Sequence, residues 1–135
     1  MQTESKHILV VDDDDMIRSC IIEILNLEGY EVYSAEHGKQ ALDILTTMKK
    51  ADYPGCIILD LKMPVMDGQT FLKNIRSKYS DSLGRIPVIV ASANGNLSDS
   101  PELRDAAVEL WDKPIELEDI SRIAHKYCGE PTMLQ

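Results

Sequence analysis

Acidic residues, one serine and one lysine end or closely follow short apolar runs of this sequence. Four aspartates, Asp12 to Asp15, follow the first run, and Asp60, Ser92 and Lys113 are associated in the same way with three later runs. Carboxylates held close together repel one another, and a dication with oxygen ligands relieves that repulsion. Mg²⁺ prefers a few carboxylates together with waters and phosphate oxygens. A lysine and a hydroxyl beside such an ion would stabilise a phosphoryl group during its transfer.

Each of these residues also has a plainer interpretation. Asp14 and Asp15 are expected to cap the first helix, because carboxylates accept hydrogen bonds from the N–H groups that a helix start leaves free. Asp12 and Asp13 directly follow a buried strand, where open α/β sheets form their ligand sites, and we place them in the site. A serine or a lysine at one strand end is weak evidence by itself. The joint placement at four strand ends is what predicts a common site.

Five short segments are expected to form the strands that position this chemistry. Four of them, residues 8–11, 56–59, 88–91 and 109–111, are apolar with little alternation. That pattern is typical of parallel strands covered on both faces by helices. The fifth segment, residues 31–35, is more polar and suits an edge strand.

Helical patterns fill the intervals between these segments. Apolar residues recur with helical spacing within residues 17–25, 41–48 and 120–127. Gly29 is expected to end the first helix, and Asp67-Gly68 to open another before Phe71. Ser100-Pro101-Glu102 predicts the start of a further, shorter helix. Alternation of strands and helices along one chain of 135 residues predicts a single α/β domain.

Composition narrows the classes of function. The chain has 14 Lys+Arg against 23 Asp+Glu and a formal net charge of -9, which disfavours direct binding to nucleic acid. No apolar run has the length of a membrane span or a signal peptide. The cysteines Cys20, Cys56 and Cys128 are too widely spaced for a zinc motif, and their odd number argues against a disulfide framework. Cys20 and Cys56 lie in apolar runs and are expected to be buried, and we expect a reducing, cytoplasmic environment.

The residues around these strand ends resemble the receiver domain of two-component response regulators. The resemblance rests on four motifs that occur in order: Val10-Val11-Asp12-Asp13, Leu59-Asp60-Leu61-Lys62-Met63-Pro64 with Asp67-Gly68, residues 87–93, and Lys113-Pro114. It extends over about residues 6–127 and implies one receiver domain within 1–135. The implied fold is a flavodoxin-like (βα)5 three-layer sandwich with five parallel strands in the order 2-1-3-4-5. The implied function is that of a phosphorylation-dependent switch in a phosphorelay.

The resemblance also implies a metal site. Asp60 would be the phosphoacceptor and, together with Asp13, would bind Mg²⁺ directly, with Mn²⁺ as a substitute. The backbone carbonyl of Lys62 would complete the protein ligands, and Asp12 would act mainly through water.

The phosphoryl group would be contacted by the remaining residues of the motif. Lys113, the hydroxyl of Ser92 and the backbone N–H of Ala93 would bind its oxygens. The donor would be a phosphohistidine of a histidine kinase or a histidine phosphotransfer protein. Phosphorylation would change the surface of the fourth helix, fifth strand and fifth helix, and so act on an output protein or domain. The protein would be a monomer or a phosphorylation-dependent dimer.

One position departs from the family pattern. The family usually carries an aromatic residue three positions before the lysine, where this chain has Leu110, with Trp111 following it. Whether an aromatic side chain takes part in the switch therefore stays open.

Other functions fit the sequence less well. A phosphatase with an aspartyl-phosphate intermediate would need a second acid two residues after its nucleophile, where Lys62 stands. A nucleotide hydrolase would need a G-x-x-x-x-G-K-[ST] loop, and a flavodoxin would need a hydroxyl- and glycine-rich loop in place of the four aspartates. An adaptor that binds partners without phosphorylation is disfavoured, because the full set of acids, hydroxyl and lysine is present. The choice between a free-standing regulator and part of a larger regulator or hybrid kinase stays open.

Overall fold

A computed structural model gives the fold of the chain and describes residues 7–60, 68–78, 83–92, 105, 107–112 and 115–129. Five parallel strands form one sheet in the order β2-β1-β3-β4-β5. The strands are β1 (His7–Val11), β2 (Glu31–Ala35), β3 (Cys56–Asp60), β4 (Val88–Ser92) and β5 (Glu109–Asp112). The predicted flavodoxin-like order is confirmed, and the polar segment at residues 31–35 is an edge strand.

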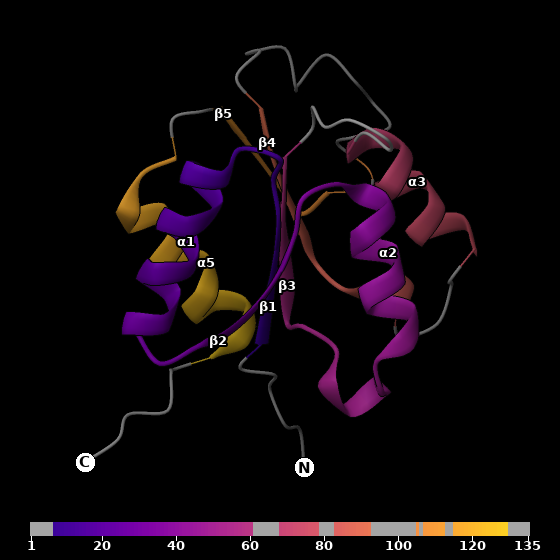
Figure 1. Ribbon diagram of the computed structural model, residues 1–135, viewed down its shortest axis with the longest axis horizontal. Helices are drawn as coiled ribbons and strands as arrows, with labels where there is room; N and C mark the ends of the chain where they lie inside the picture. Colours follow the sequence, from indigo (N-terminus) through magenta and orange to yellow (C-terminus); the bar gives the residue numbers. More distant parts are fainter. Residues whose placement is uncertain are drawn as a thin grey trace.

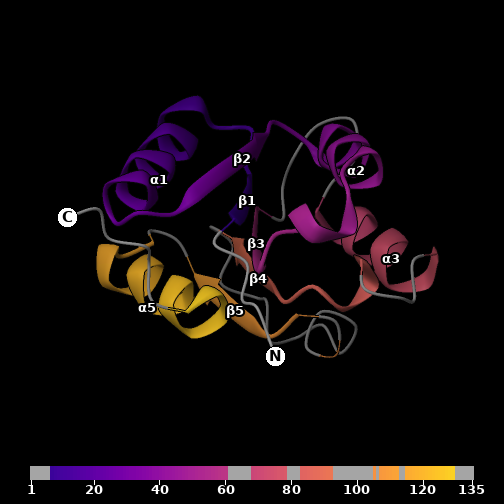
Figure 2. The same cartoon turned by 90° about the horizontal axis from the view of Figure 1, so that it is seen from below.

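Helices cover both faces of the sheet (Figure 1). The α-helices are α1 (Asp15–Leu27), α2 (Gly38–Thr47), α3 (Gly68–Lys78) and α5 (Leu117–Cys128), with short 3₁₀ helices η1 (Lys50–Asp52) and η2 (Leu83–Arg85). The view from below shows α1 and α5 on one face and α2 and α3 on the other (Figure 2). The helix predicted to begin at Ser100-Pro101-Glu102 lies outside the described residues. Within the described part of the chain, no helix combines the length and the apolar character that crossing a bilayer would need.

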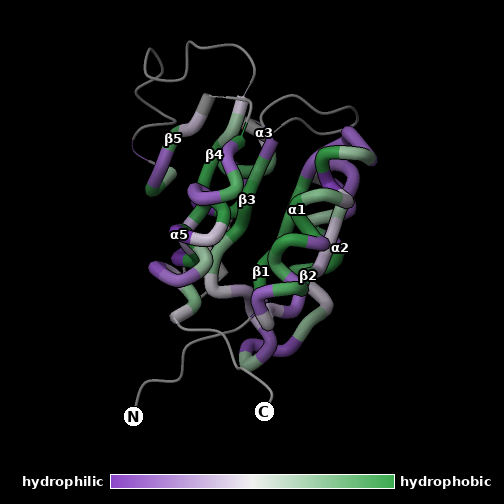
Figure 3. Tube along the Cα trace, turned by 90° about the vertical axis from the view of Figure 1, so that its left-hand side faces the viewer, coloured by the Kyte–Doolittle hydropathy of each residue, from purple (hydrophilic) through white to green (hydrophobic). Residues whose placement is uncertain are grey.

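The core consists of two layers, one on each face of the sheet. Leu9 and Val11 of β1 pack toward α2 and α3, whereas Ile8 and Val10 pack toward α1 and α5. Successive side chains of a strand point to opposite faces, so a strand covered on both sides must be apolar at every position. The central strands are accordingly hydrophobic along most of their length (Figure 3).

Helix α1 starts and ends as its sequence predicts. Asp14 is the N-cap, and its carboxylate accepts a hydrogen bond from the N–H of Ile17 at 3.0 Å. Asp15 lies in the first turn, where a negative charge is favourable. Gly29 has a φ of 98°, a value that suits glycine at the end of a helix.

One burial prediction was wrong. Cys20 is exposed, although Cys56 and Cys128 are buried. The buried stripe of α1 is centred on Ile21 and Leu25, and Cys20 lies about 100° around the helix from Ile21. Apolar neighbours in the sequence suggested that Cys20 is buried, but on the helix Cys20 lies outside the buried stripe.

Candidate functional site

The register of the sheet brings the predicted strand ends together at one edge. Val11 of β1 pairs with Leu59 of β3, so the residues that follow them, Asp12 and Asp60, lie side by side. On the other side of β3, Asp60 pairs with Ala91, which places Ser92 one residue further along β4. Because all the strands are parallel, these residues share the carboxyl edge of the sheet, where open α/β sheets bind ligands.

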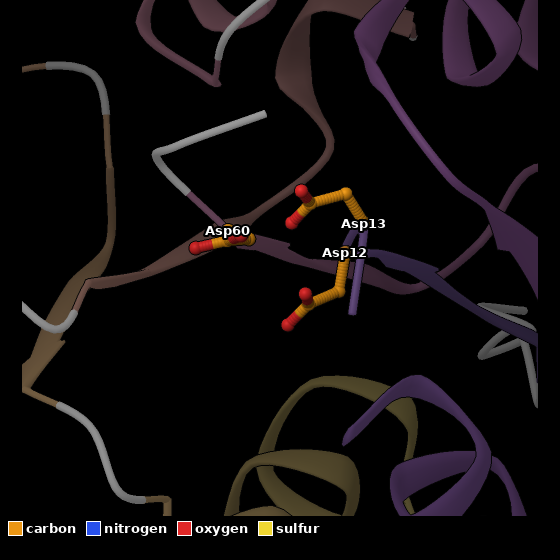
Figure 4. A group of neighbouring side chains, drawn as sticks. All are labelled: Asp12, Asp13 and Asp60. Atoms are coloured by element: carbon orange, nitrogen blue, oxygen red, sulfur yellow. The ribbon is translucent and has the colours of Figure 1, made fainter. Parts of the chain in front are cut away.

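Three carboxylates converge at this edge. Asp12, Asp13 and Asp60 each offer one carboxylate oxygen, and these oxygens all lie within 4.8 Å of one another. Figure 4 shows the three side chains, two from the end of β1 and one from the end of β3. Asp12 and Asp60 are only 3% and 6% exposed, whereas Asp13 is open to solvent. The cluster therefore has two buried acids and one side from which an ion can enter.

The donor set fits a small, hard dication. Mg²⁺ binds oxygen at 2.0–2.1 Å, so two oxygens on one ion lie about 3–4 Å apart. The oxygens of this cluster all lie within 4.8 Å of one another, so they need to close by at most about 2 Å to reach that spacing. Carboxylates are the charged ligands that Mg²⁺ takes, and waters and phosphate oxygens typically complete its coordination.

The loop after β1 separates two roles among its four aspartates. Asp12 is anchored at both ends: its N–H donates to the carbonyl of Ala35 at 3.1 Å, and its carboxylate accepts the N–H of Asp14 at 2.9 Å. Asp12 and Asp13 join Asp60, whereas Asp14 caps α1. The division expected from the sequence is the one that the loop adopts.

The remaining predicted site residues are only partly described. Ser92 is 2% exposed at the end of β4. Ser92 pairs with Asp112, the last residue of β5. Lys113 is the next residue along the chain, and like Lys62 and Ala93 it lies outside the described residues. The roles assigned to these residues stay predictions.

Strand β5 directs its two large side chains to opposite faces. Leu110 packs toward α2 and α3, whereas Trp111 packs toward α1 and α5. The indole N–H of Trp111 donates to Glu109 at 3.0 Å, and the guanidinium of Arg122 lies 5.9 Å from the centre of the indole ring. The aromatic ring of β5 therefore lies on the α5 side, opposite to the side that Leu110 occupies.

Glu109 is the centre of a polar network that the sequence did not reveal. Its carboxylate accepts hydrogen bonds from Trp111, from Arg122 at 3.0 Å and from the hydroxyl of Tyr127 at 3.2 Å. Partial burial by itself raises the pKa of Glu109, but the hydrogen bonds from Arg122 and Trp111 outweigh it and leave the pKa below its ordinary value. The network ties the start of β5 to α5 by contacts between residues 13 and 18 positions apart.

Comparisons with known proteins agree with this geometry. A family model described as the response regulator receiver domain matches residues 8–125. The chain is 37% identical to sporulation initiation phosphotransferase F of Bacillus subtilis over 124 residues, which are 91% of this chain and 94% of that protein. It is 31% identical to the regulatory protein AtoC of Escherichia coli over 92% of this chain, but spans only 25% of that protein.

Solved structures show the same likeness. The response regulator protein TrrA of Thermotoga maritima, solved in complex with Mg(2+)-BeF, has a TM-score of 0.75 and 30% sequence identity to this chain. The match covers 90% of this chain and 97% of that one. The likeness therefore extends over nearly the whole fold.

Proposed function

This chain belongs to the family of response regulator receiver domains, phosphorylation-dependent switches of two-component systems, and on that premise we propose that Asp60 is its phosphoacceptor. The donor is a phosphohistidine of a histidine kinase or of a histidine phosphotransfer protein. The observation that carries the proposal is the convergence of Asp12, Asp13 and Asp60 at the carboxyl edge of the sheet. Asp60 is the member of that cluster that lies at the end of a central strand, between β1 and β4.

In this proposal Asp13 and Asp60 would bind Mg²⁺ directly, with Mn²⁺ as a substitute and the backbone carbonyl of Lys62 as a further ligand, and Asp12 would act mainly through water. A bound dication supplies positive charge that neutralises the oxygens of the transferring phosphoryl group. The TrrA structure, which was solved in complex with Mg(2+)-BeF, supports the proposal that this receiver fold binds a metal ion.

The chemical step is a transfer of the phosphoryl group between two protein side chains. An oxygen of the Asp60 carboxylate attacks phosphorus in line with the P–N bond of the phosphohistidine. That bond breaks, its electron pair stays on the imidazole nitrogen, and an acyl phosphate forms on Asp60. Lys113, the Ser92 hydroxyl and the Ala93 N–H contact the phosphoryl oxygens, and water later hydrolyses the acyl phosphate. The protein in this proposal takes one phosphoryl group from its donor and loses it by hydrolysis, without turning over an external phosphoester.

The output of the switch is a change of surface. Ser92 is buried at the end of β4. A hydrogen bond from its hydroxyl to the phosphoryl group shifts the surface of the predicted fourth helix, β5 and α5 between two states. The partner that reads this surface is a separate protein or a further domain, as the greater length of AtoC illustrates.

Phosphotransfer labelling tests the proposal. Wild type and Asp60→Asn are incubated with acetyl phosphate, or with a phosphorylated histidine kinase, in Mg²⁺ or in EDTA, and phosphorylation is counted by intact-protein mass spectrometry. Asp52→Asn, at an exposed aspartate of η1, serves as the matched control. We expect one phosphoryl group per chain in wild type and in the control, and none in Asp60→Asn or in EDTA.

Two results would overturn the proposal. Equal labelling of Asp60→Asn would place the phosphoacceptor elsewhere. Continuous hydrolysis of an added phosphomonoester by wild type would instead indicate a phosphatase.

A further inference from the structure

We propose that Arg18 is a positioning residue for the metal site, and that it raises the affinity of the site for Mg²⁺ without binding the ion. Its guanidinium holds the loop that carries Asp12 and Asp13. The inference rests on the proposed function in one respect only, which is that these carboxylates and Asp60 bind a divalent cation.

The guanidinium of Arg18 connects the loop to the first turn of α1. One of its terminal nitrogens donates to the backbone carbonyl of Asp12 at 2.7 Å, and the other donates to the carboxylate of Asp15. The Arg18 side chain is only 14% exposed and its bond to Asp12 is partly buried, whereas its bond to Asp15 is exposed to solvent. Hydrogen bonds from a charged donor are stronger than bonds between neutral groups. The sequence signal for the second bond is the i,i+3 spacing of Asp15 and Arg18, but nothing in the sequence indicates the bond to Asp12.

With this contact, Asp12 is held at three points. Its N–H donates to Ala35 of β2, its carboxylate accepts the N–H of Asp14, and its carbonyl accepts Arg18. The carbonyl of Asp12 belongs to the peptide unit that leads into Asp13. Arg18 therefore fixes the backbone from which the second carboxylate of the cluster projects.

Fixing that backbone matters because the negative charges of the three carboxylates oppose their close approach. Three carboxylates within 4.8 Å repel one another in the metal-free protein, and a loose loop would relieve the repulsion by moving Asp12 and Asp13 away from Asp60. An ion would then have to restore the arrangement at the expense of its binding energy. Holding the loop beforehand removes that cost.

The positive charge of Arg18 has the opposite effect on Mg²⁺ affinity from its positioning of the loop. The direction in which the affinity changes when Arg18 is removed therefore tests the inference. A cation near the site repels Mg²⁺, so a purely electrostatic role predicts that removal of Arg18 tightens binding. In the structure that charge is paired with Asp15, a carboxylate outside the cluster. We therefore expect the loss of positioning to outweigh the loss of charge.

The test measures metal affinity in the full chain. Mn²⁺ binding is followed by the EPR signal of the free ion, and Mg²⁺ binding by competition with Mn²⁺. Arg18→Ala is expected to weaken both by about tenfold, as loss of a group that orients metal ligands typically does. Arg18→Lys keeps one donor and the charge, and is expected to restore part of the affinity. Arg85→Ala, at an exposed arginine of η2, controls for net charge and should bind as wild type does.

A second measurement needs no metal. In EDTA, Arg18→Ala should accelerate hydrogen exchange at the N–H of Asp14, which bonds to Asp12, while the N–H of Val10 in β1 exchanges as in wild type. A general loss of stability would accelerate both amides. The comparison therefore separates a loosened loop from a weakened fold.

The possible failures are distinguishable. Unchanged or tighter Mn²⁺ binding by Arg18→Ala, with wild type binding normally, overturns the positioning role alone. Absence of Mn²⁺ binding by wild type, or equal binding by Asp13→Asn, overturns the metal site and with it the proposed function.

Discussion

Removal of the charge of Asp13 should stabilise the metal-free protein and weaken its binding of Mg²⁺. Asp13 is the exposed member of the cluster, whereas Asp12 and Asp60 are buried. Asp13→Asn keeps the size of the side chain and removes its repulsion by the other two carboxylates. A substitution that improves stability and impairs binding is the expected signature of a binding site that carries like charges.

The distances in the cluster set the size of the effect. Two unit charges 4.8 Å apart repel by about 0.9 kcal/mol in a water-like dielectric and by about 3.5 kcal/mol at a dielectric constant of about 20. Because Asp13 is exposed, the lower value applies to each of its two pairs. Screening at about 0.1 M salt leaves a total of about 1 kcal/mol, or about 4 °C in Tm for a domain of this size.

Urea unfolding, followed by circular dichroism, measures both halves of the prediction. In EDTA, Asp13→Asn should be more stable than wild type by about 1 kcal/mol, and the difference should shrink at high salt. With free Mg²⁺ at ten times the Kd of wild type, the free energy of unfolding of wild type should rise by about 1.4 kcal/mol, and that of the variant should rise clearly less. Glu23→Gln removes one negative charge from an exposed position on α1 and controls for net charge.

The reasoning is refuted if, in EDTA, Asp13→Asn is not more stable than both wild type and the control variant Glu23→Gln. It is equally refuted if Mg²⁺ stabilises the variant as much as it stabilises wild type. The first result would mean that the three carboxylates do not repel one another as their spacing requires, and the second that Asp13 does not bind the ion.

Three further predictions concern other parts of the fold. Of the three thiols, only Cys20 should react quickly with Ellman's reagent in the native protein, because Cys56 and Cys128 are buried. The sulfur atoms of Cys56 and Cys128 lie 4.0 Å apart, and the hydrogen bond to Cys128, together with burial, raises the pKa of Cys56. Rapid reaction of more than one thiol would contradict this prediction. Glu109→Gln should cost about 1–2 kcal/mol of stability at neutral pH. Because the folded protein lowers the pKa of Glu109, that contribution is present above the ordinary pKa and is lost as the pH falls through the lowered one, so urea midpoints of the two proteins should converge in acid. Mg²⁺ with beryllofluoride should change the fluorescence of Trp111, which lies two residues before the lysine predicted to contact the phosphoryl group; a flat signal would show that β5 does not respond to the site.

Much of the local structure was readable in the sequence because its causes are local. Between their terminal residues the central strands are apolar because both of their faces are covered, and that pattern is visible in any one strand. The cap at Asp14 and the end of α1 near Gly29 depend on residues within one turn. The order 2-1-3-4-5 is different, because no strand carries a mark of its neighbours, and the expectation came from the resemblance to a family.

The candidate site was readable for a related reason. Parallel strands present their carboxyl ends to the same edge, so acids after two such strands must meet if the strands are neighbours. The sequence supplied the acids after β1 and β3, and the tertiary structure supplied the adjacency. Arg18 and Glu109 were missed because their partners are set by how a helix packs on the sheet, as the bonds from Arg18 to Asp12 and from Arg122 to Glu109 show.

The sequence by itself determined which residues are candidates for the chemistry and which segments present them, since residue type, burial pattern and helix caps are properties of short stretches of chain. Only the tertiary structure decided what depends on the rotation and register of whole elements. It turned Cys20 outward, directed Trp111 to the face covered by α1 and α5, and brought Cys56 within 4.0 Å of Cys128 across 72 residues. The 4.8 Å convergence of the three carboxylates belongs to this second class, because it exists only when β1 and β3 lie side by side in one register.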